Sequence, residues 1–259
     1  MDLGIAGRSA IVCASSRGLG RACALALAKE GVNVWICGRD EASLGKARDE
    51  IAGAGGGAVH AIVADVTSAA DRRRLLEACP EPDILVNNAG GPPPGDFRDW
   101  DQSDWFDAVN ANMYSPIDMI RLTLDGMIDR RFGRIVNITS SSVKEPIPDL
   151  GLSNGARSGL TGFVSGIARE PARYNVTINN LLPGYHATAR LDAIFGSRAA
   201  AAGQTTEEYM QAFFADFPAG RPGDPDEFGA VCAFLCSQQA AYITAQNILV
   251  DGGRIRTTF

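Results

Sequence analysis

The chain has 259 residues, of which 46% are hydrophobic, and this is enough to bury the core of a single α/β domain. Its formal net charge of -6 would repel nucleic acid and anionic membranes rather than attract them. A small molecule is therefore the expected partner.

Short apolar or β-branched runs alternate with longer helical patterns along the chain. The expected strands are 9–14, 32–37, 58–63, 83–88, 134–139, 175–182 and 246–250. The expected helices lie near 18–30, 40–52, 68–79, 101–130, 154–173 and 224–237. This alternation predicts right-handed crossovers and a doubly wound, mostly parallel sheet with helices on both faces. The predicted architecture is a single three-layer α/β/α domain over residues 1–259.

Three segments depart from this alternation. The proline-rich loop at 90–96 follows an expected strand and should border the binding crevice. The run RRR at 72–74 is interpreted as a solvated helix face. An Ala-rich helical segment at 191–214 precedes the last crossover, and we expect an insertion over about 189–218 that covers the substrate.

The beginning of the chain shows no cationic leader followed by a long apolar stretch, and no later run reaches ~18 uninterrupted apolar residues. We therefore expect a cytoplasmic protein that does not bind membranes. The six cysteines lie in apolar contexts without CxxC or CxxH spacing. They are interpreted as buried, reduced thiols, and no metal site is expected.

The first expected strand runs into a glycine-containing turn, CASSRGLG at 13–20, which opens a helix. Backbone N–H groups at a helix start bind a pyrophosphate well, and Gly18 and Gly20 allow the chain to approach it closely. The turn therefore indicates a dinucleotide site, and an ordinary tight strand-to-helix turn is the alternative.

The second expected strand ends at Gly38 and Arg39, where a carboxylate would receive the ribose hydroxyls of NAD. Arg17 in the glycine turn supplies a second guanidinium nearby. Two arginines at the adenosine ribose favour a 2′-phosphate, so NADP(H) is predicted and NAD(H) is less favoured. Asp40, one residue later, could restore an NAD-like contact.

The chain resembles the short-chain dehydrogenase/reductase family over nearly its whole length, and the combination of motifs is more specific than any single one. The motifs that carry the resemblance are CASSRGLG (13–20), ADV (64–66), NNAG (87–90), Asn112, Ser140, PGYHAT (183–188) and ITAQNILVDGG (243–253). Cys13 and Ala14 stand where the family usually has Thr-Gly. The alanine is expected to cost only a methyl group at the turn, so binding should survive.

The resemblance implies which residues bind the cofactor. They are Ser15, Ser16, Arg17, Gly18, Leu19, Gly20, Arg39, Asp65, Val66, Asn88, Ala89, Gly90, Arg157, Pro183, Gly184 and Thr188. In this family Asp65 and Val66 would flank the adenine, and Pro183, Gly184 and Thr188 would hold the nicotinamide amide. The resemblance also implies a homotetramer formed through the helices near 101–130 and 154–173, with a dimer as the alternative.

The resemblance breaks at the residues for proton transfer. The family passes a proton through a tyrosine whose pKa is lowered by a lysine one helical turn later, while a serine and an asparagine organise the site. Ser140 and Asn112 match this pattern, but Ser153 and Arg157 occupy the positions of the tyrosine and the lysine. No tyrosine lies between positions 115 and 173, so no shift of register recovers one.

Arg157 keeps the positive charge and can anchor ribose, whereas Ser153 is far less acidic than a phenol and cannot simply replace it. Tyr185, which immediately follows Pro183 and Gly184, is the leading replacement for the missing phenol. Lys144, His186 and Tyr114 are alternatives for moving the proton, although Lys144 could equally be a loop cation.

The first functional hypothesis is an NADP(H)-dependent oxidoreductase that interconverts a small carbonyl compound and its alcohol. The expected catalytic residues are Asn112, Ser140, Ser153, Arg157 and Tyr185. A non-redox lyase or isomerase on the same fold is the second hypothesis, and a non-catalytic NADP(H)-binding module is the third, because fold alone does not fix function.

Overall fold

The computed structural model describes residues 2–257. Its strands form one parallel sheet of seven in the order β3-β2-β1-β4-β5-β6-β7. The strands are β1 (Ser9–Val12), β2 (Asn33–Gly38), β3 (Val59–Val63), β4 (Ile84–Asn87), β5 (Gly133–Ile138), β6 (Val176–Pro183) and β7 (Asn247–Val250). Every strand expected from the sequence is present, and the predicted doubly wound fold is confirmed.

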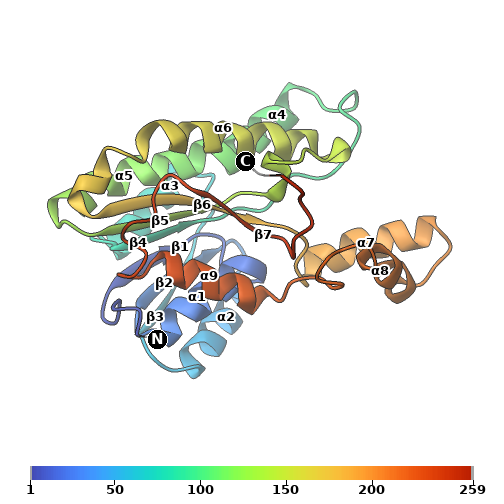
Figure 1. Cartoon of the computed structure of the whole chain (residues 1–259). Helices are drawn as coiled ribbons and strands as arrows, with labels where there is room; N and C mark the ends of the chain where they lie inside the picture. Colours follow the sequence, from blue (N-terminus) through green and yellow to red (C-terminus); the bar gives the residue numbers. More distant parts are fainter. Residues whose placement is uncertain (1, 258–259) are drawn as a thin grey trace.

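Helices cover both faces of the sheet, as Figure 1 shows. One face carries α1 (Gly18–Lys29), α2 (Glu41–Gly53) and α9 (Pro225–Leu235). The other carries α3 (Ala69–Ala78), α4 (Gln102–Val109), α5 (Ser115–Asp129) and α6 (Gly151–Ile167). Alternate residues of each strand face opposite layers: Ala10 and Val12 of β1 join the first core, whereas Ile11 joins the second.

The strand order reverses between β1 and β4, which places a crevice at their carboxyl ends. The glycine turn follows β1 and the NNAG segment follows β4, so both border this crevice. The same edge of the sheet receives the segments that follow β5 and β6. The fold therefore brings the predicted cofactor and catalytic segments to one edge.

The helix expected over 101–130 is made of three parts. Asp101 caps α4 by accepting bonds from two backbone N–H groups, and a π-helical turn, Asn110–Tyr114, then joins α4 to α5. The N–H of Ser115 bonds to the carbonyl of Asn110, which is the longer repeat that defines a π turn. Such turns are frequent at functional sites, and this one contains Asn112.

The interpretation of RRR as a solvated face is wrong for Arg72. This side chain is 1% exposed, and its Nε donates to Asp118 of α5 over 2.8 Å. Its Nη1 donates to the carbonyl of Val66 over 2.7 Å. Arg72 therefore ties α3 and the end of β3 to α5, whereas Arg73 and Arg74 remain exposed.

The segment predicted to be helical at 191–214 forms two helices, α7 (Ala189–Ala201) and α8 (Thr206–Phe214). They extend to one side of the sheet layers in Figure 1. Their core is separate from the two main ones and contains Leu191, Phe195 and Phe214, with Tyr185 packed against it. Three short 3₁₀ turns, Ser141–Val143, Pro148–Leu150 and Pro171–Tyr174, complete the connections.

Candidate active site

The turn between β1 and α1 is shaped to hold an anion at the start of α1. No side chain caps this helix end, whereas Asp40 and Ser68 cap α2 and α3 by accepting bonds from backbone N–H groups. Gly18 has a φ of 59°, and a Cβ at Gly20 would lie 2.6 Å from the carbonyl oxygen of Ala14. The backbone therefore requires both glycines, and the uncapped N–H groups suit a diphosphate.

Ser15 and Ser16 hold this turn against the end of β2. The buried Ser15 hydroxyl donates to the carbonyl of Val12 over 2.6 Å and accepts from the N–H of Cys37 over 3.1 Å. Ser16 lies against Gly38, where a Cβ would come 3.1 Å from the serine Oγ. Ser15 is thus occupied by protein partners and shapes the turn.

The expectation that Ala14 costs only a methyl group is wrong. Ala14 has a φ of 44°, in the left-handed region that a residue with a Cβ adopts only with strain. The turn keeps its form because the N–H of Cys13 bonds to Val86 and the carbonyl of Ala14 accepts from Asn88. The alanine therefore costs stability rather than the shape of the site.

The adenosine end of the crevice leaves Arg39 available. Its side chain is 78% exposed, and the nearest carboxylate, that of Asp65, lies 3.9 Å away. Asp40 instead caps α2, since its Oδ1 accepts from the N–H of Ser43 over 2.8 Å. Hydrogen bonds from the Ser43 side chain and backbone lower the pKa of Asp40, and the charge of Arg17 adds to this. Asp40 is thus engaged as a helix cap, and the two arginines remain for a phosphate.

The predicted apolar contacts of the cofactor crevice come from three residues. Leu19 packs against the core on the α1 side of the sheet, and Val66 and Ala89 belong to the core on the other side. These side chains therefore lie in the two cores that flank the crevice.

The end of β4 is joined to the π turn by Asn112. This asparagine is 2% exposed, and its Nδ2 donates to the carbonyl of Gly90 over 3.3 Å. Its Oδ1 is buried and has no hydrogen-bond partner within residues 2–257. A buried carbonyl oxygen of this kind favours a bound water, which fits the predicted role of Asn112 in organising the site.

Ser153 and Arg157 are brought to the end of β5, next to Ser140. The Nε of Arg157 donates to the Ser153 Oγ over 3.2 Å, and its Nη1 donates to the carbonyl of Ile138, the last residue of β5, over 2.8 Å. A guanidinium can only donate, so the hydroxyl of Ser153 accepts this bond and its own O–H is left for another acceptor. The Ser140 Oγ accepts from the N–H of Ser142 over 3.1 Å and has the same freedom.

The guanidinium of Arg157 is a buried cation. The side chain is 8% exposed, and no carboxylate lies within 4.0 Å of it among residues 2–257. Burial lowers the pKa of Arg157 to about 10, and repulsion by Arg190 contributes to the shift. Arg157 therefore keeps its positive charge at neutral pH and can stabilise negative charge at the site.

The end of β6 brings the predicted nicotinamide segment beside the glycine turn. A Cβ at Gly18 would lie 3.8 Å from the Cγ2 of Thr188, which caps α7 by accepting from the N–H of Leu191. A Cβ at Gly184 would lie 2.7 Å from Asp251, so only glycine allows the segment after Pro183 to pass the end of β7. The predicted diphosphate turn and the predicted nicotinamide segment are thus close together.

Tyr185 lies between the predicted cofactor segment and the α7–α8 core. Its ring centroid is 5.1 Å from that of Phe213, and the guanidinium carbon of Arg254 is 5.7 Å from the Tyr185 centroid. A cation near the ring face attracts the phenol electrostatically. Tyr185 is therefore held in place by aromatic packing at the base of α7 and α8.

The alternative proton carriers lie in different surroundings. His186 is buried against Phe228, and burial lowers its pKa, so it is neutral at pH 7. Tyr114 is an exposed side chain that lies near the guanidinium of Arg72, on the α3 side of the π turn. Lys144 is partly buried in the segment after β5. Of these, Lys144 lies closest in the chain to Ser140.

Sequence reasoning missed two interactions at this edge. Arg190 of α7 donates to the carbonyls of Gly91 and Pro92 over 2.8 and 3.0 Å, which ties α7 to the loop after β4. Arg254, after β7, reaches Glu145 over 3.5 Å. The only sequence signal for Arg190 is the paired glycine at 90–91, because a Cβ at Gly91 would lie 2.9 Å from the guanidinium.

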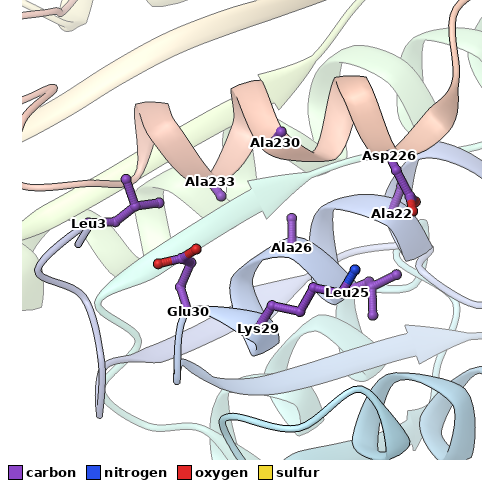
Figure 2. A pocket seen from close by; sticks show the side chains of 9 residues that line it. All are labelled: Leu3, Ala22, Leu25, Ala26, Lys29, Glu30, Asp226, Ala230 and Ala233. Atoms are coloured by element: carbon purple, nitrogen blue, oxygen red, sulfur yellow. The ribbon is translucent and has the colours of Figure 1, made fainter. Parts of the chain in front are cut away.

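A shallow hollow on the other face of the molecule is not part of this site. Figure 2 shows it between α1 and α9, where four alanines line it together with the larger side chains of Leu3, Leu25, Lys29, Glu30 and Asp226. A Cβ at Gly229 would lie 2.5 Å from the carbonyl oxygen of Ala22, so the two helices pack very closely beside it. None of the predicted site residues lines this hollow.

Within residues 2–257, the helices are too short or too polar to cross a bilayer. In the same part of the chain, no cluster of three or more His, Cys, Asp or Glu side chains is arranged to hold a metal ion. All six cysteines lie in the core as free thiols.

The fold and this site together define a dinucleotide-binding α/β protein with its reacting groups at the carboxyl edge of a doubly wound sheet. A family model described as enoyl-(acyl carrier protein) reductase matches residues 13–254. The chain belongs to the short-chain dehydrogenase/reductase family, a family of oxidoreductases, as its sequence motifs predicted.

Two curated relatives illustrate the similarity in sequence. The 3-oxoacyl-(acyl-carrier-protein) reductase FabG of Vibrio harveyi is 34% identical over 254 residues, which cover 97% of this chain and 98% of the relative. The acetoacetyl-CoA reductase of Allochromatium vinosum is 32% identical over 253 residues, covering 95% and 98% of the two chains.

Among solved structures, the L-sorbose reductase from Gluconobacter frateurii, complexed with NADPH and L-sorbose, superposes with a TM-score of 0.94. It is 26% identical and the match covers 99% of this chain and 100% of that one. The similarity thus extends over the whole domain, including the α7–α8 region.

Proposed function

We propose that this protein is an NADP(H)-dependent oxidoreductase that interconverts a small carbonyl compound and its alcohol at an atypical proton-transfer site. The proposal rests above all on one observation. The cation of Arg157 is buried beside Ser153 and tied to the end of β5, where Ser140 follows. This geometry suits the stabilisation of an oxygen that gains negative charge during reduction.

The residues around the crevice fit NADP(H). The uncapped start of α1 suits the diphosphate, and the exposed Arg39 together with Arg17 suits the 2′-phosphate. Two solved relatives, the sorbose reductase and an actinorhodin polyketide ketoreductase, are described as complexes with NADPH. NADPH supplies the hydride when it is bound.

The proposed roles of the catalytic residues follow from their donors and charges. Ser140 and Ser153 each have a free O–H to donate to the substrate oxygen, and the charge of Arg157 stabilises that oxygen as hydride arrives. Asn112 holds water through its unpartnered oxygen, and the proton comes from this water or from Tyr185. Since general acid catalysis contributes about 10²–10⁴-fold in rate, its weakening leaves a reaction driven by hydride positioning.

A titration of the protein with NADPH and NADH, followed by tryptophan or cofactor fluorescence, tests the cofactor. We expect NADPH to bind more tightly, because Arg39 is 78% exposed and its nearest carboxylate, that of Asp65, lies 3.9 Å away. Failure to bind either cofactor would remove the proposal.

A screen of diketones, ketoesters and quinones, followed by the absorbance of NADPH, tests the reaction. In the presence of an active substrate, Ser140→Ala should lower kcat by about 10²–10³-fold while NADPH binding is retained. Ser165→Ala is the matched control, because Ser165 bonds within α6 to the carbonyl of Thr161. NADPH binding without any oxidation would instead favour a non-redox enzyme or a binding module.

We also propose a cytoplasmic homotetramer, or failing that a dimer, formed through α4, α5 and α6. The support is the exposure of large apolar side chains, namely Trp105 and Phe106 of α4 and Tyr114 of the π turn that follows it. Sedimentation equilibrium of the purified protein gives the oligomeric state directly.

A further inference from the structure

Two guanidinium groups at the carboxyl edge of the sheet have no counter-charge. Arg157 bonds to the Ser153 hydroxyl and to the carbonyl of Ile138. Arg190, at the start of α7, bonds to two backbone carbonyls in the loop after β4. All four partners are neutral, and within residues 2–257 neither guanidinium has a carboxylate within 4.0 Å.

Two other arginines near this edge are neutralised. Arg198 of α7 donates to Asp149 over 2.9 Å, and Arg254 lies 3.5 Å from Glu145. Carboxylates are therefore present on these loops, and they pair with the outer arginines rather than with Arg157 and Arg190. Arg157 and Arg190 are left without such a partner among residues 2–257.

The two unpaired cations also act on each other. Their backbone partners follow neighbouring strands, since Ile138 ends β5 and Gly91 lies after β4, the strand that pairs with β5. Repulsion by Arg190 also contributes to the lowered pKa of Arg157. Gly91 makes room for Arg190, since a Cβ there would come within 2.9 Å of the guanidinium. Two like charges that the fold brings together, one of them buried, raise the energy of the free protein.

An anionic ligand would remove this cost. Each guanidinium has five N–H donors, and the bonds to the protein use two nitrogens of each, so donors remain on both side chains. A carboxylate matches the fork of donors that an arginine presents. Arg157 bonds to Ser153, so a carboxylate bound by Arg157 would lie beside the hydroxyl that is proposed to hold the substrate oxygen.

We propose that the substrate is an oxo acid whose free carboxylate is bound by Arg157 and Arg190 next to the carbonyl that is reduced. This inference rests on the proposed reductase function and specifies its substrate class. It separates this chain from an enzyme for carrier-bound thioesters, which have no free carboxylate at that position. The cofactor phosphates are served instead by the start of α1 and by Arg17 and Arg39.

Matched substrates test the inference through a ratio. The rate of NADPH oxidation is measured with 2-oxo-4-phenylbutyrate and its ethyl ester, and with acetoacetate and ethyl acetoacetate. In Arg190→Gln, the ratio of kcat/KM for acid over ester should fall by about 10–100-fold, as expected for the loss of a charge-assisted hydrogen bond. Arg169→Gln removes the same charge beyond the far end of α6 and should leave the ratio unchanged.

Two kinetic outcomes would overturn the inference while the reductase function stands. One is an equal loss for acid and ester in Arg190→Gln. The other is an unchanged ratio together with weaker NADPH binding, which would assign Arg190 to the cofactor phosphates.

Calorimetric titration keeps the test independent of turnover. The same acid and ester are titrated into the protein saturated with NADP⁺, for the unmodified chain and for Arg190→Gln. Tighter binding of the acid, lost in Arg190→Gln, supports the carboxylate site even if no substrate is reduced and the proposed function fails. Equal binding of acid and ester contradicts it.

Discussion

Arg157 differs from a lysine in how it bonds to the end of β5. Its planar group bonds at once to Ser153 and Ile138 and still has donors left, whereas a lysine has only three donors around a single nitrogen. The guanidinium also stays charged when buried, because its ordinary pKa is so high. The residue therefore provides a permanent cation beside Ser153.

This permanence predicts the pH profile of Arg157→Lys. Burial lowers the pKa of Arg157 to about 10, so the unmodified protein should lose kcat/KM only as pH rises toward 10. The ordinary pKa of lysine is about 10.4, and the same burial lowers it further, so the variant should lose its cation about two pH units earlier. The profile is measured from pH 6 to 10.5 with one substrate. Superimposable profiles would show that the charge at this position is not needed.

Ala14 gives a prediction on stability at the same scale. Its φ of 44° is strained for a residue with a Cβ, so Ala14→Gly should raise the free energy of unfolding by about 1 kcal/mol. Urea denaturation measures the difference. Ala172→Gly in a 3₁₀ turn is the control and should not stabilise, and a destabilised Ala14→Gly variant would contradict the strain.

The sequence predicted individual residues best where backbone geometry restricts the choice. Gly18 and Gly20 could be assigned to a phosphate turn because only glycine fits there. Arg39 could be identified because it directly follows the last residue of β2. Arg190 could not be found, since its partners are backbone carbonyls of a loop about one hundred residues away. The same limit applies to the strain at Ala14, which depends on a φ value that the letters do not contain.

At the scale of elements, α3 and α5 are joined through a buried ion pair. Asp118 accepts from Arg72 over 2.8 Å and from Arg121 over 2.8 Å. Arg72 has almost no exposure, and this carboxylate is the counter-charge of its guanidinium. The pair fixes the segment after β3 relative to α5, and with it the adjoining π turn.

Asp118→Asn should therefore lower the free energy of unfolding by about 3–5 kcal/mol, because it leaves Arg72 buried without a counter-charge. Urea denaturation at pH 7 measures this loss. Asp129→Asn at the exposed end of α5 is the matched control and should change stability by no more than about 0.5 kcal/mol. A similar small change in both variants would show that Arg72 finds other partners.

The same carboxylate predicts a pH dependence. Burial opposes the ionisation of Asp118, but hydrogen bonds from Arg121 and Arg72 outweigh it and lower the pKa. A lowered pKa contributes stability above the unfolded value of about 3.9 and loses it as pH falls through the folded value. The difference between the unmodified chain and Asp118→Asn should therefore shrink as pH falls from 5 toward 3.

Element types were predictable because apolar runs and helical patterns alternate so strictly. The π turn at Asn110–Tyr114 was not, because one longer hydrogen bond leaves no mark in the spacing of apolar residues. The burial of Arg72 was also missed, since its partner lies 46 residues away on another helix. Tertiary contacts decided both features.

The whole molecule consists of a layered sheet domain and a projecting pair of helices. The main cores on the two faces of the sheet are large and continuous, whereas the α7–α8 core is small and mostly aromatic. Arg190, Arg198 and Tyr185 connect this pair to the rest of the site. Such a unit can open locally without unfolding the sheet, which suits a cover for a substrate.

Phe195→Ala tests this independence. Phe195 is fully buried in the centre of the aromatic cluster, and removing a buried phenylalanine typically costs about 3–5 kcal/mol. Because Phe195 belongs to the α7–α8 core and not to the two main cores, we expect the lost stability to appear as local opening of α7 and α8. Trypsin should then cleave after Arg198 at least tenfold faster, and the KM for substrate should rise.

Global stability is followed in the same variant by tryptophan fluorescence in urea, since Trp35, Trp100 and Trp105 all lie outside α7 and α8. The midpoint should shift little in Phe195→Ala. Phe228→Ala in α9 is the matched control, as its side chain is equally buried but in the main core. It should lower the urea midpoint strongly, with cleavage following the global transition. If Phe195→Ala lowered the midpoint as much, α7 and α8 would fold with the sheet as one unit and could not open alone over the site.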